Sequence, residues 1–404
     1  MIDLSIWTFP LSAILAVAYV IALALFWERL RKPLLRSLTP LRASVAMMLL
    51  VMLTQVLEGT WSMPLHRSWP FALLLLLVMF VLGATAVGDC RRKVCSTSFL
   101  SHAGLLLVLW AGFFGAPDVQ DAQMIASKER SVHLAYGKGG EYVLVPFEVQ
   151  LKDFCVDYYE GSHMPKQYTS TLLVDGEEMK TSVNHPCSHN GWSFYQYDYD
   201  HSAHRYSVIK LVRDPWLPFV YLGMAMLVLG AILQVREAWH SKRTLPIILL
   251  LTVGFGLLSV ARINFGTLMP ALRSLWFVPH LIVYMLAYAV LALASILPLW
   301  QRCTQRANEI PKKLLSTASA LLLIGMLCGA VWAKEAWGHY WTWDAKECWA
   351  AVTWMLTLAG MHLPQRRTAL ISLFIWLSFI AMQITWYGVN YLPSAHQSLH
   401  TYNQ

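Results

Sequence analysis

The sequence has few charged residues. Asp, Glu, Lys and Arg make up 13% of its 404 residues, whereas a soluble globular protein carries about a quarter. Hydrophobic residues make up 57%. This scarcity of charge excludes an ordinary soluble domain. Several apolar runs reach the ~20 residues that a spanning helix needs, so we expect an integral membrane protein.

The sequence also lacks a long basic run, although its net charge is +8. Its basic residues occur in short clusters between the apolar runs, which argues against nucleic acid as a partner and fits the positive-inside rule. None of its seven cysteines forms a CxxC, so a zinc knuckle or a thioredoxin-like redox pair is not expected. The first apolar run lacks the basic residues that open a cleavable signal peptide.

Apolar runs predict an all-α polytopic membrane protein of about ten transmembrane helices, with one inserted small β-rich domain. The second and ninth runs are short, and the ninth is a candidate for a partly interfacial helix. The predicted spans are 11–27, 43–57, 69–88, 99–115, 215–235, 244–261, 276–300, 315–333, 349–363 and 368–392.

Lys and Arg predict the orientation of these spans. Alternate connecting segments carry 17 basic residues on one side and 5 on the other. The richer side is expected to be cytoplasmic. Both termini, segment 116–214 and a tryptophan-rich segment near residue 340 then lie outside. The cytoplasmic segments are 28–42, 89–98, 236–243, 301–314 and 364–367.

Segment 116–214 differs from the rest in pattern. Polar and apolar residues alternate in EYVLVPFEVQL, YTSTLLVDG, GWSFYQYDYD and YSVIKLVRD, which predicts antiparallel strands. About 100 residues suffice for a small β-sandwich or open barrel. Cys155 and Cys187 both lie here, on the oxidising side. They are a candidate disulfide whose geometry the sequence does not give.

Four histidines lie near the ends of predicted spans and form two pairs at matched depth. His102 and His362 are near the inner face, and His280 and His400 are near the outer face. A lone histidine at a span end is most often an interfacial residue. Two matched pairs favour metal ligation, and a pair of imidazoles suits the two axial positions of haem iron.

The stretch WGHYWTWDAKECWAAVTW concentrates wide aromatic rings in one outer loop and the helix after it. An aromatic belt at the membrane interface would spread its tryptophans over many span ends. The cluster therefore predicts a site for a flat apolar ligand. Asp344 and Glu347 would repel haem propionates, so we assign them to bracing the loop or pairing with Lys346. The tryptophans are Trp337, Trp341, Trp343, Trp349 and Trp354.

This stretch closely resembles the tryptophan-rich WWD signature of the haem-handling protein family, in the form found in CcsA (ResC). PALRSLWFVPHLIVYMLAY, MHLPQRR and GVNYLPSAHQSLHTY are similar to the CcsA segments that carry haem histidines. They map to His280, His362 and His400, with His396 as a competitor for the last. SFLSHAGLLLVLWAGFFG and VNHPCSHNGWSFYQYDYD resemble CcsB (ResB), which places a further ligand at His102.

The resemblance implies a fused CcsBA-type system II cytochrome c synthase with a shortened periplasmic CcsB domain. It divides the chain into N-terminal CcsB-like spans, a CcsB-like β-rich periplasmic domain, two further spans, and a CcsA-like haem-handling region. These parts are 1–115, 116–214, 215–261 and 262–404. The bacterial inner membrane is the implied location, with the haem-attachment site on the periplasmic face.

A holocytochrome c synthase (cytochrome c haem lyase) would export haem b and attach it to the CxxCH motif of apocytochrome c. His280 and His400 would be catalytic and, with His102 and His362, would ligate haem iron. Thioredoxin-like reductants and membrane lipid are the further implied partners. The alternative is a non-catalytic exporter or chaperone that delivers haem to a separate ligase. The implied cofactor-binding set adds Trp337, Trp341, Trp343, Asp344, Trp349 and Trp354.

Overall fold

The computed structural model describes most of the chain in nine stretches. All the structural findings below concern these residues. They are 11–12, 14–19, 21–22, 25, 40–94, 96–137, 139–239, 268–304 and 310–397. The predicted first span therefore lies only partly within the described residues, and the sixth, 244–261, lies outside them.

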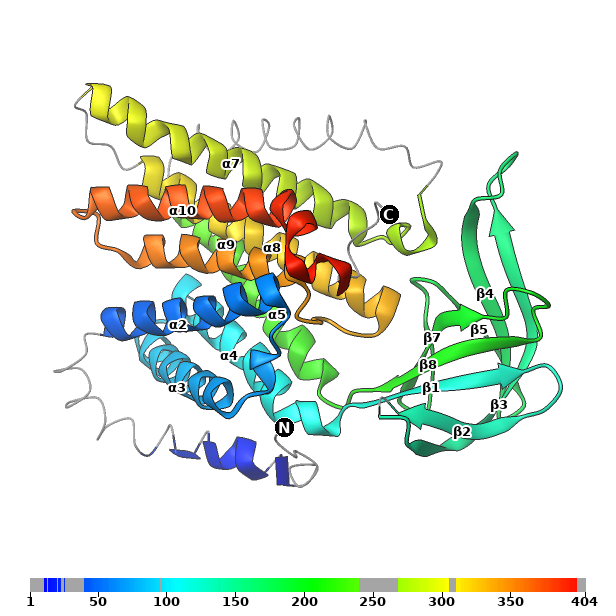
Figure 1. Cartoon of the computed structure of the whole chain (residues 1–404). Helices are drawn as coiled ribbons and strands as arrows, with labels where there is room; N and C mark the ends of the chain where they lie inside the picture. Colours follow the sequence, from blue (N-terminus) through cyan, green and yellow to red (C-terminus); the bar gives the residue numbers. More distant parts are fainter. Residues whose placement is uncertain are drawn as a thin grey trace.

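Eight long helices account for the described part of the bundle (Figure 1). Seven of them are long and apolar enough to cross a membrane, so the chain is a multi-pass membrane protein. The exception is α9, whose hydropathy is lowered by Lys346, Glu347 and His362. The helices are α2 (Pro40–Trp61), α3 (Trp69–Arg92), α4 (Thr97–Gly115), α5 (Leu217–Ala238), α7 (Phe277–Thr304), α8 (Ile310–Trp337), α9 (Ala345–His362) and α10 (Thr368–Trp386).

Six of these helices form a closed ring. Helix α2 packs on α3, α3 on α4, α4 on α5, α5 on α8, α8 on α9, and α9 returns to α2. Small residues permit the close approaches, as is usual between membrane helices. A Cβ added to Gly104 of α4 would lie 2.9 Å from the carbonyl oxygen of Gly223 on α5. Helices α7 and α10 lie outside the ring, against α8 and α9 (Figure 1).

The inserted domain is one antiparallel sheet of eight strands, in the order β5-β4-β3-β2-β1-β8-β7-β6. It stands at one end of the bundle (Figure 1). The four predicted strands correspond to β3, β4, β7 and β8. The strands are β1 (Gln120–Ser127), β2 (Val132–Gly137), β3 (Tyr142–Tyr158), β4 (Pro165–Val174), β5 (Glu177–Ser182), β6 (Cys187–His189), β7 (Trp192–Tyr199) and β8 (Tyr206–Arg213).

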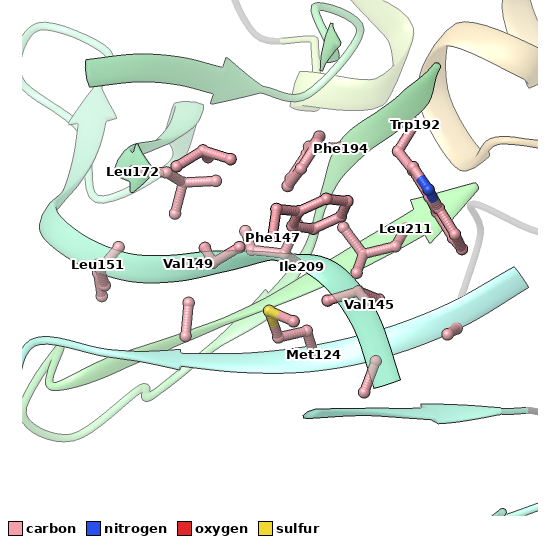
Figure 2. Close-up of a cluster of buried hydrophobic side chains, with 14 of the residues drawn as sticks. Met124, Val145, Phe147, Val149, Leu151, Leu172, Trp192, Phe194, Ile209 and Leu211 are labelled. Atoms are coloured by element: carbon pink, nitrogen blue, oxygen red, sulfur yellow. The ribbon is translucent and has the colours of Figure 1, made fainter. Parts of the chain in front are cut away.

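The sheet curls around a single apolar core, as expected for an open barrel. Figure 2 shows Met124, Phe147 and Leu211 from three strands converging on this core, and all three are buried. The curl brings β5 against β7, where the Thr181 hydroxyl donates to the carbonyl of Phe194 at 2.7 Å. The alternating pattern of each strand supplies one inward face, which is why the sequence alone predicts the domain.

Three sequence-based expectations need correction or completion. The tenth span ends at Trp386 rather than at residue 392, and two short 3-10 helices follow, η6 (Gly388–Tyr391) and η7 (Pro393–Gln397). The ninth, helical over 345–362, lies among α2, α8 and α10. Cys155 and Cys187 are both free thiols, the first exposed on β3 and the second packed beside the sheet core.

Candidate functional site

The turn between α8 and α9 is braced by its two carboxylates. Asp344 caps α9, and its Oδ1 accepts from the backbone N–H groups of Lys346 at 2.7 Å and Glu347 at 3.3 Å. Oε2 of Glu347 accepts from the backbone N–H of Thr342 at 2.7 Å and of Asp344 at 3.3 Å. This reciprocal capping box confirms the predicted bracing role, because both carboxylates satisfy the donors at the helix start.

The five tryptophans of the stretch occupy three different places. Trp337 lies 5.2 Å from Trp332, whose ring lies 6.0 Å from that of His280. Trp341 and Trp343 meet edge to face at 6.3 Å, on the side of α2 and α3. The remaining two point into the bundle from α9. Trp349 packs with α2, and Trp354 joins the core between α5 and α8. The five rings do not form one continuous face.

His280 is held by α8. Its Nδ1 lies 2.8 Å from the carbonyl oxygen of Gly325 and donates to it, so the imidazole lone pair lies on Nε2. The ring also packs against Tyr284, 4.9 Å away in an edge-to-face arrangement, and against Trp332. A backbone carbonyl on Nδ1 is the usual support for a histidine that ligates through Nε2.

His102 and His362 lie at the end of the bundle away from the sheet. Nδ1 of His102 lies 2.8 Å from Oδ2 of Asp89 on α3, and Nδ1 of His362 lies 2.8 Å from the carbonyl oxygen of Leu358. Their helices, α4 and α9, stand opposite each other in the ring of six helices.

His400 lies outside the described residues. The chain leading toward it turns back over the bundle through η6 and η7, and the Ser394 hydroxyl donates to the carbonyl of Gly59 at 2.6 Å. This contact fixes residue 394 at the C-terminal end of α2. The start of α9 is close by, because a Cβ added to Gly59 would lie 2.8 Å from Cβ of Cys348.

Sequence reasoning missed His66, in the short 3-10 helix η2 (Leu65–Arg67) between α2 and α3. Its imidazole lies flat on the indole of Trp343, with ring centroids 4.7 Å apart and planes 3° from parallel. Its Nδ1 pairs with the carboxylate of Glu58, which is only 3% exposed. Trp343 has a φ of +62°, a strained value for a bulky residue. The sequence feature that could have revealed this site is Glu58, a carboxylate at the end of an apolar run.

Sequence reasoning also missed a contact between the sheet and the tryptophan stretch. Lys210 of β8 is 6% exposed, and its Nζ donates to the carbonyl oxygen of Trp337 at 2.8 Å. The same Nζ lies 2.5 Å from Nε2 of His339. Oδ2 of Asp121, on the adjacent strand β1, lies 3.1 Å from that Nε2 and 3.8 Å from the ammonium. Lys210 occurs in a strand-like pattern, where an exposed side chain is the default expectation.

Two phenols beside this contact are largely shielded from solvent. Burial raises the pKa of Tyr195 on β7 and the pKa of Tyr340 in the turn well above the ordinary value for tyrosine. Both hydroxyls therefore stay protonated across the physiological range. Hydrogen bonds to the turn gain strength in such surroundings, because water does not compete for the same donors and acceptors.

Two protein families match consecutive parts of the chain. Residues 95–205 match the ResB-like family, and residues 216–396 match the cytochrome C assembly protein family. The first region contains His102 and most of the sheet. The second contains His280, His362 and the whole tryptophan stretch, and it ends before His400.

Curated relatives carry the name cytochrome c biogenesis protein CcsA. The Prochlorococcus marinus (strain MIT 9215) protein is 34% identical over 181 residues, which cover 34% of this chain and 57% of the relative. The Guillardia theta protein is 32% identical over 175 residues, 33% of this chain and 56% of the relative. The Synechococcus sp. (strain CC9605) protein is 29% identical over 225 residues, 42% and 71% respectively. The chain thus spans little more than half the length of the first two.

Proposed function

Because this one chain carries a ResB-like region followed by a cytochrome C assembly protein region, the composition of a fused CcsB/CcsA protein of system II, we propose that it exports haem and attaches it to apocytochrome c. The presence of both regions in one polypeptide is the observation that supports this proposal. Export and attachment in one polypeptide would let haem reach the outer face without release into water, where a flat apolar ring is poorly solvated.

Three of the four candidate ligands lie within the described residues, and their hydrogen bonds support roles as haem ligands. His102, His280 and His362 each commit Nδ1 to a protein acceptor, which orients the lone pair of Nε2 outward from the imidazole edge. His102 has the strongest support, because a carboxylate on Nδ1 raises the basicity of the ligating nitrogen. In the proposed route, His102 and His362 hold haem b inside the ring of helices, and His280 and His400 hold it at the outer end.

Attachment joins two cysteine thiols of CxxCH to the two vinyl groups of haem. Each sulfur bonds to the inner vinyl carbon and a proton is added to the outer one, so no net oxidation occurs. The thiols and the iron must be reduced beforehand, and thioredoxin-like proteins are the proposed source for the thiols. The chain's own contribution would be to hold haem and peptide together in a productive orientation, which alone accounts for large rate gains.

The tryptophans contribute to this role in different ways. Trp337 lies on the His280 side, next to the proposed outer haem site. Trp349 and Trp354 each bury an indole N–H that has no acceptor among the described residues. A buried donor without a partner is costly, so a polar group of a ligand passing through the bundle would be favoured there.

Expression of the full chain in a bacterial host that lacks its own maturation system tests the proposal. Covalent haem on a co-expressed CxxCH protein, detected by haem stain after denaturation, is the expected result. His280→Ala and His400→Ala should each abolish most product, and added imidazole should restore part of it. Haem bound by the purified chain without any covalent product would instead favour the exporter or chaperone function. Full product from both variants without imidazole would remove these two histidines from the mechanism.

A further inference from the structure

The geometry assigns a positioning role to Lys210 and Asp121: we propose that these two residues of the sheet fix the conformation of the tryptophan turn, residues 337–344, and so hold the site that presents haem. The inference rests on the proposed function for its purpose. The hold of the sheet on the turn is independent of that function.

Lys210 and Asp121 lie on the outer face of the sheet, opposite its core. Ile209 and Leu211, the neighbours of Lys210 along β8, point into the core, as does Ala122 beside Asp121 on β1. Alternation along a strand therefore directs Lys210 and Asp121 outward. An outward lysine would ordinarily be solvated, but here residues 337–340 cover it and leave 6% of it exposed.

His339 is held in either of its proton states. A neutral imidazole with its proton on Nδ1 accepts at Nε2 from the Lys210 ammonium, 2.5 Å away. A protonated imidazolium is attracted to the carboxylate of Asp121, whose Oδ2 lies 3.1 Å from Nε2. Asp121 also offsets the positive charge of Lys210 across 3.8 Å. Charged groups on one partner make these contacts stronger than hydrogen bonds between neutral groups.

The turn is clamped from the bundle side as well. Nζ of Lys334 on α8 donates to the carbonyl of Gly338 at 3.1 Å, and its ammonium lies 5.2 Å from the centre of the Tyr340 ring. The carbonyls of Trp337 and Gly338 are thus held by two lysines, one from the sheet and one from the bundle. Of these two lysines, Lys210 is the one that comes from the sheet, on the strand that follows the ResB-like region.

The conformation of the turn affects two parts of the proposed haem site. Trp337, the first residue of the turn, neighbours Trp332, which lies beside His280. Trp341 and Trp343 lie further along the turn and contact each other. Release of the turn from the sheet would therefore let these rings move independently. The β-rich domain, which would meet apocytochrome c on the outer face, would in this way also set the arrangement of the tryptophan turn that presents haem.

Hydrogen–deuterium exchange on the full-length protein tests the positioning role directly. The Lys210→Met, Asp121→Asn double variant removes both charges together and leaves neither buried alone. His339→Leu removes the side chain on the turn and leaves the sheet unchanged. Both should speed exchange of the amides of residues 338–344 by about tenfold or more, since hydrogen bonds to charged groups are among the stronger ones. Amides of β3 and β4 should exchange as in the unaltered chain.

Two matched controls sharpen the result. Lys180→Met removes an exposed lysine of β5 and should change neither the turn nor the product. Lys210→Arg keeps the charge and the donors and should keep most of the protection. Unchanged exchange in residues 338–344 of both test variants would overturn the positioning role.

Product yield then links the role to function. Holocytochrome yield should fall by roughly tenfold in the double variant, in proportion to the loosened turn. Faster exchange with full yield would overturn the link to haem presentation. If the unaltered chain itself forms no covalent product, the proposed synthase function fails, and the exchange measurement still decides whether the sheet holds the turn.

Discussion

His280 packs directly against the bare Cα of Gly329, one turn along α8 from the Gly325 carbonyl that accepts its proton. A Cβ added to Gly329 would lie 2.7 Å from both Cε1 and Nδ1 of His280. Glycine at this position therefore makes room for the imidazole, and the Gly325 carbonyl sets its direction. This relationship gives a way to displace the proposed outer ligand without altering it.

Gly329→Ala should shift His280 and weaken haem binding at the outer site. The added methyl group overlaps the ring, and overpacking of this kind typically costs about 1–3 kcal/mol. The measurement is the absorbance spectrum of the purified protein, compared with that of His280→Ala. Gly112→Ala is the matched control, because an added Cβ there meets nothing within 4 Å. A spectrum identical to that of the unaltered chain would show that His280 is not a ligand.

Asp89→Asn should weaken the inner site. The carboxylate of Asp89 accepts from Nδ1 of His102 at 2.8 Å, and its charge supports ligation through the other nitrogen. Loss of such a partner typically lowers metal-site affinity roughly 10- to 100-fold. In a protein that carries His280→Ala, the haem retained through detergent purification is bound at the inner site alone. If that protein retains as much haem with Asp89→Asn as without it, Asp89 does not contribute to haem binding.

Gly338→Ala should destabilise the contact between the turn and the sheet. Gly338 has a φ of +80°, and a Cβ there would lie 3.1 Å from Val212 and 3.3 Å from Tyr195. A residue forced into such a conformation costs about 1–3 kcal/mol. The loss of stability should appear as a lower melting temperature and as weaker exchange protection of the amides of residues 337–344. The Gly112→Ala protein should melt no earlier than the unaltered chain.

Two exposed cysteines test the orientation of the bundle. Cys155 lies on β3 of the sheet, and Cys90 lies near the opposite end, in the last turn of α3. In spheroplasts of single-cysteine variants, an impermeant maleimide should label Cys155 at once and Cys90 only after permeabilisation. Labelling in the reverse order would show that the predicted orientation of the bundle is wrong. Burial raises the pKa of the Cys187 thiol to about 11, so it should stay unlabelled near neutral pH, where almost none is thiolate.

Local sequence pattern determined much of this protein. Apolar runs predicted the seven described spans, because transfer of a helix into lipid depends on the composition of that helix. Alternation predicted the β-rich domain, and the tryptophan stretch predicted the family by resemblance. Asp344 and Glu347 were assigned correctly because a capping box is a contact between residues three apart.

Tertiary structure decided everything that depends on contacts between distant segments. Five tryptophans close in sequence separate into three places, because a turn and a helix point them in different directions. His66 meets Trp343 across 277 positions only because α2 packs on α9. Lys210 has the pattern of a solvated strand residue, and it is buried because a turn from another domain covers it. Burial of a side chain by a remote segment leaves no periodic signal in the sequence.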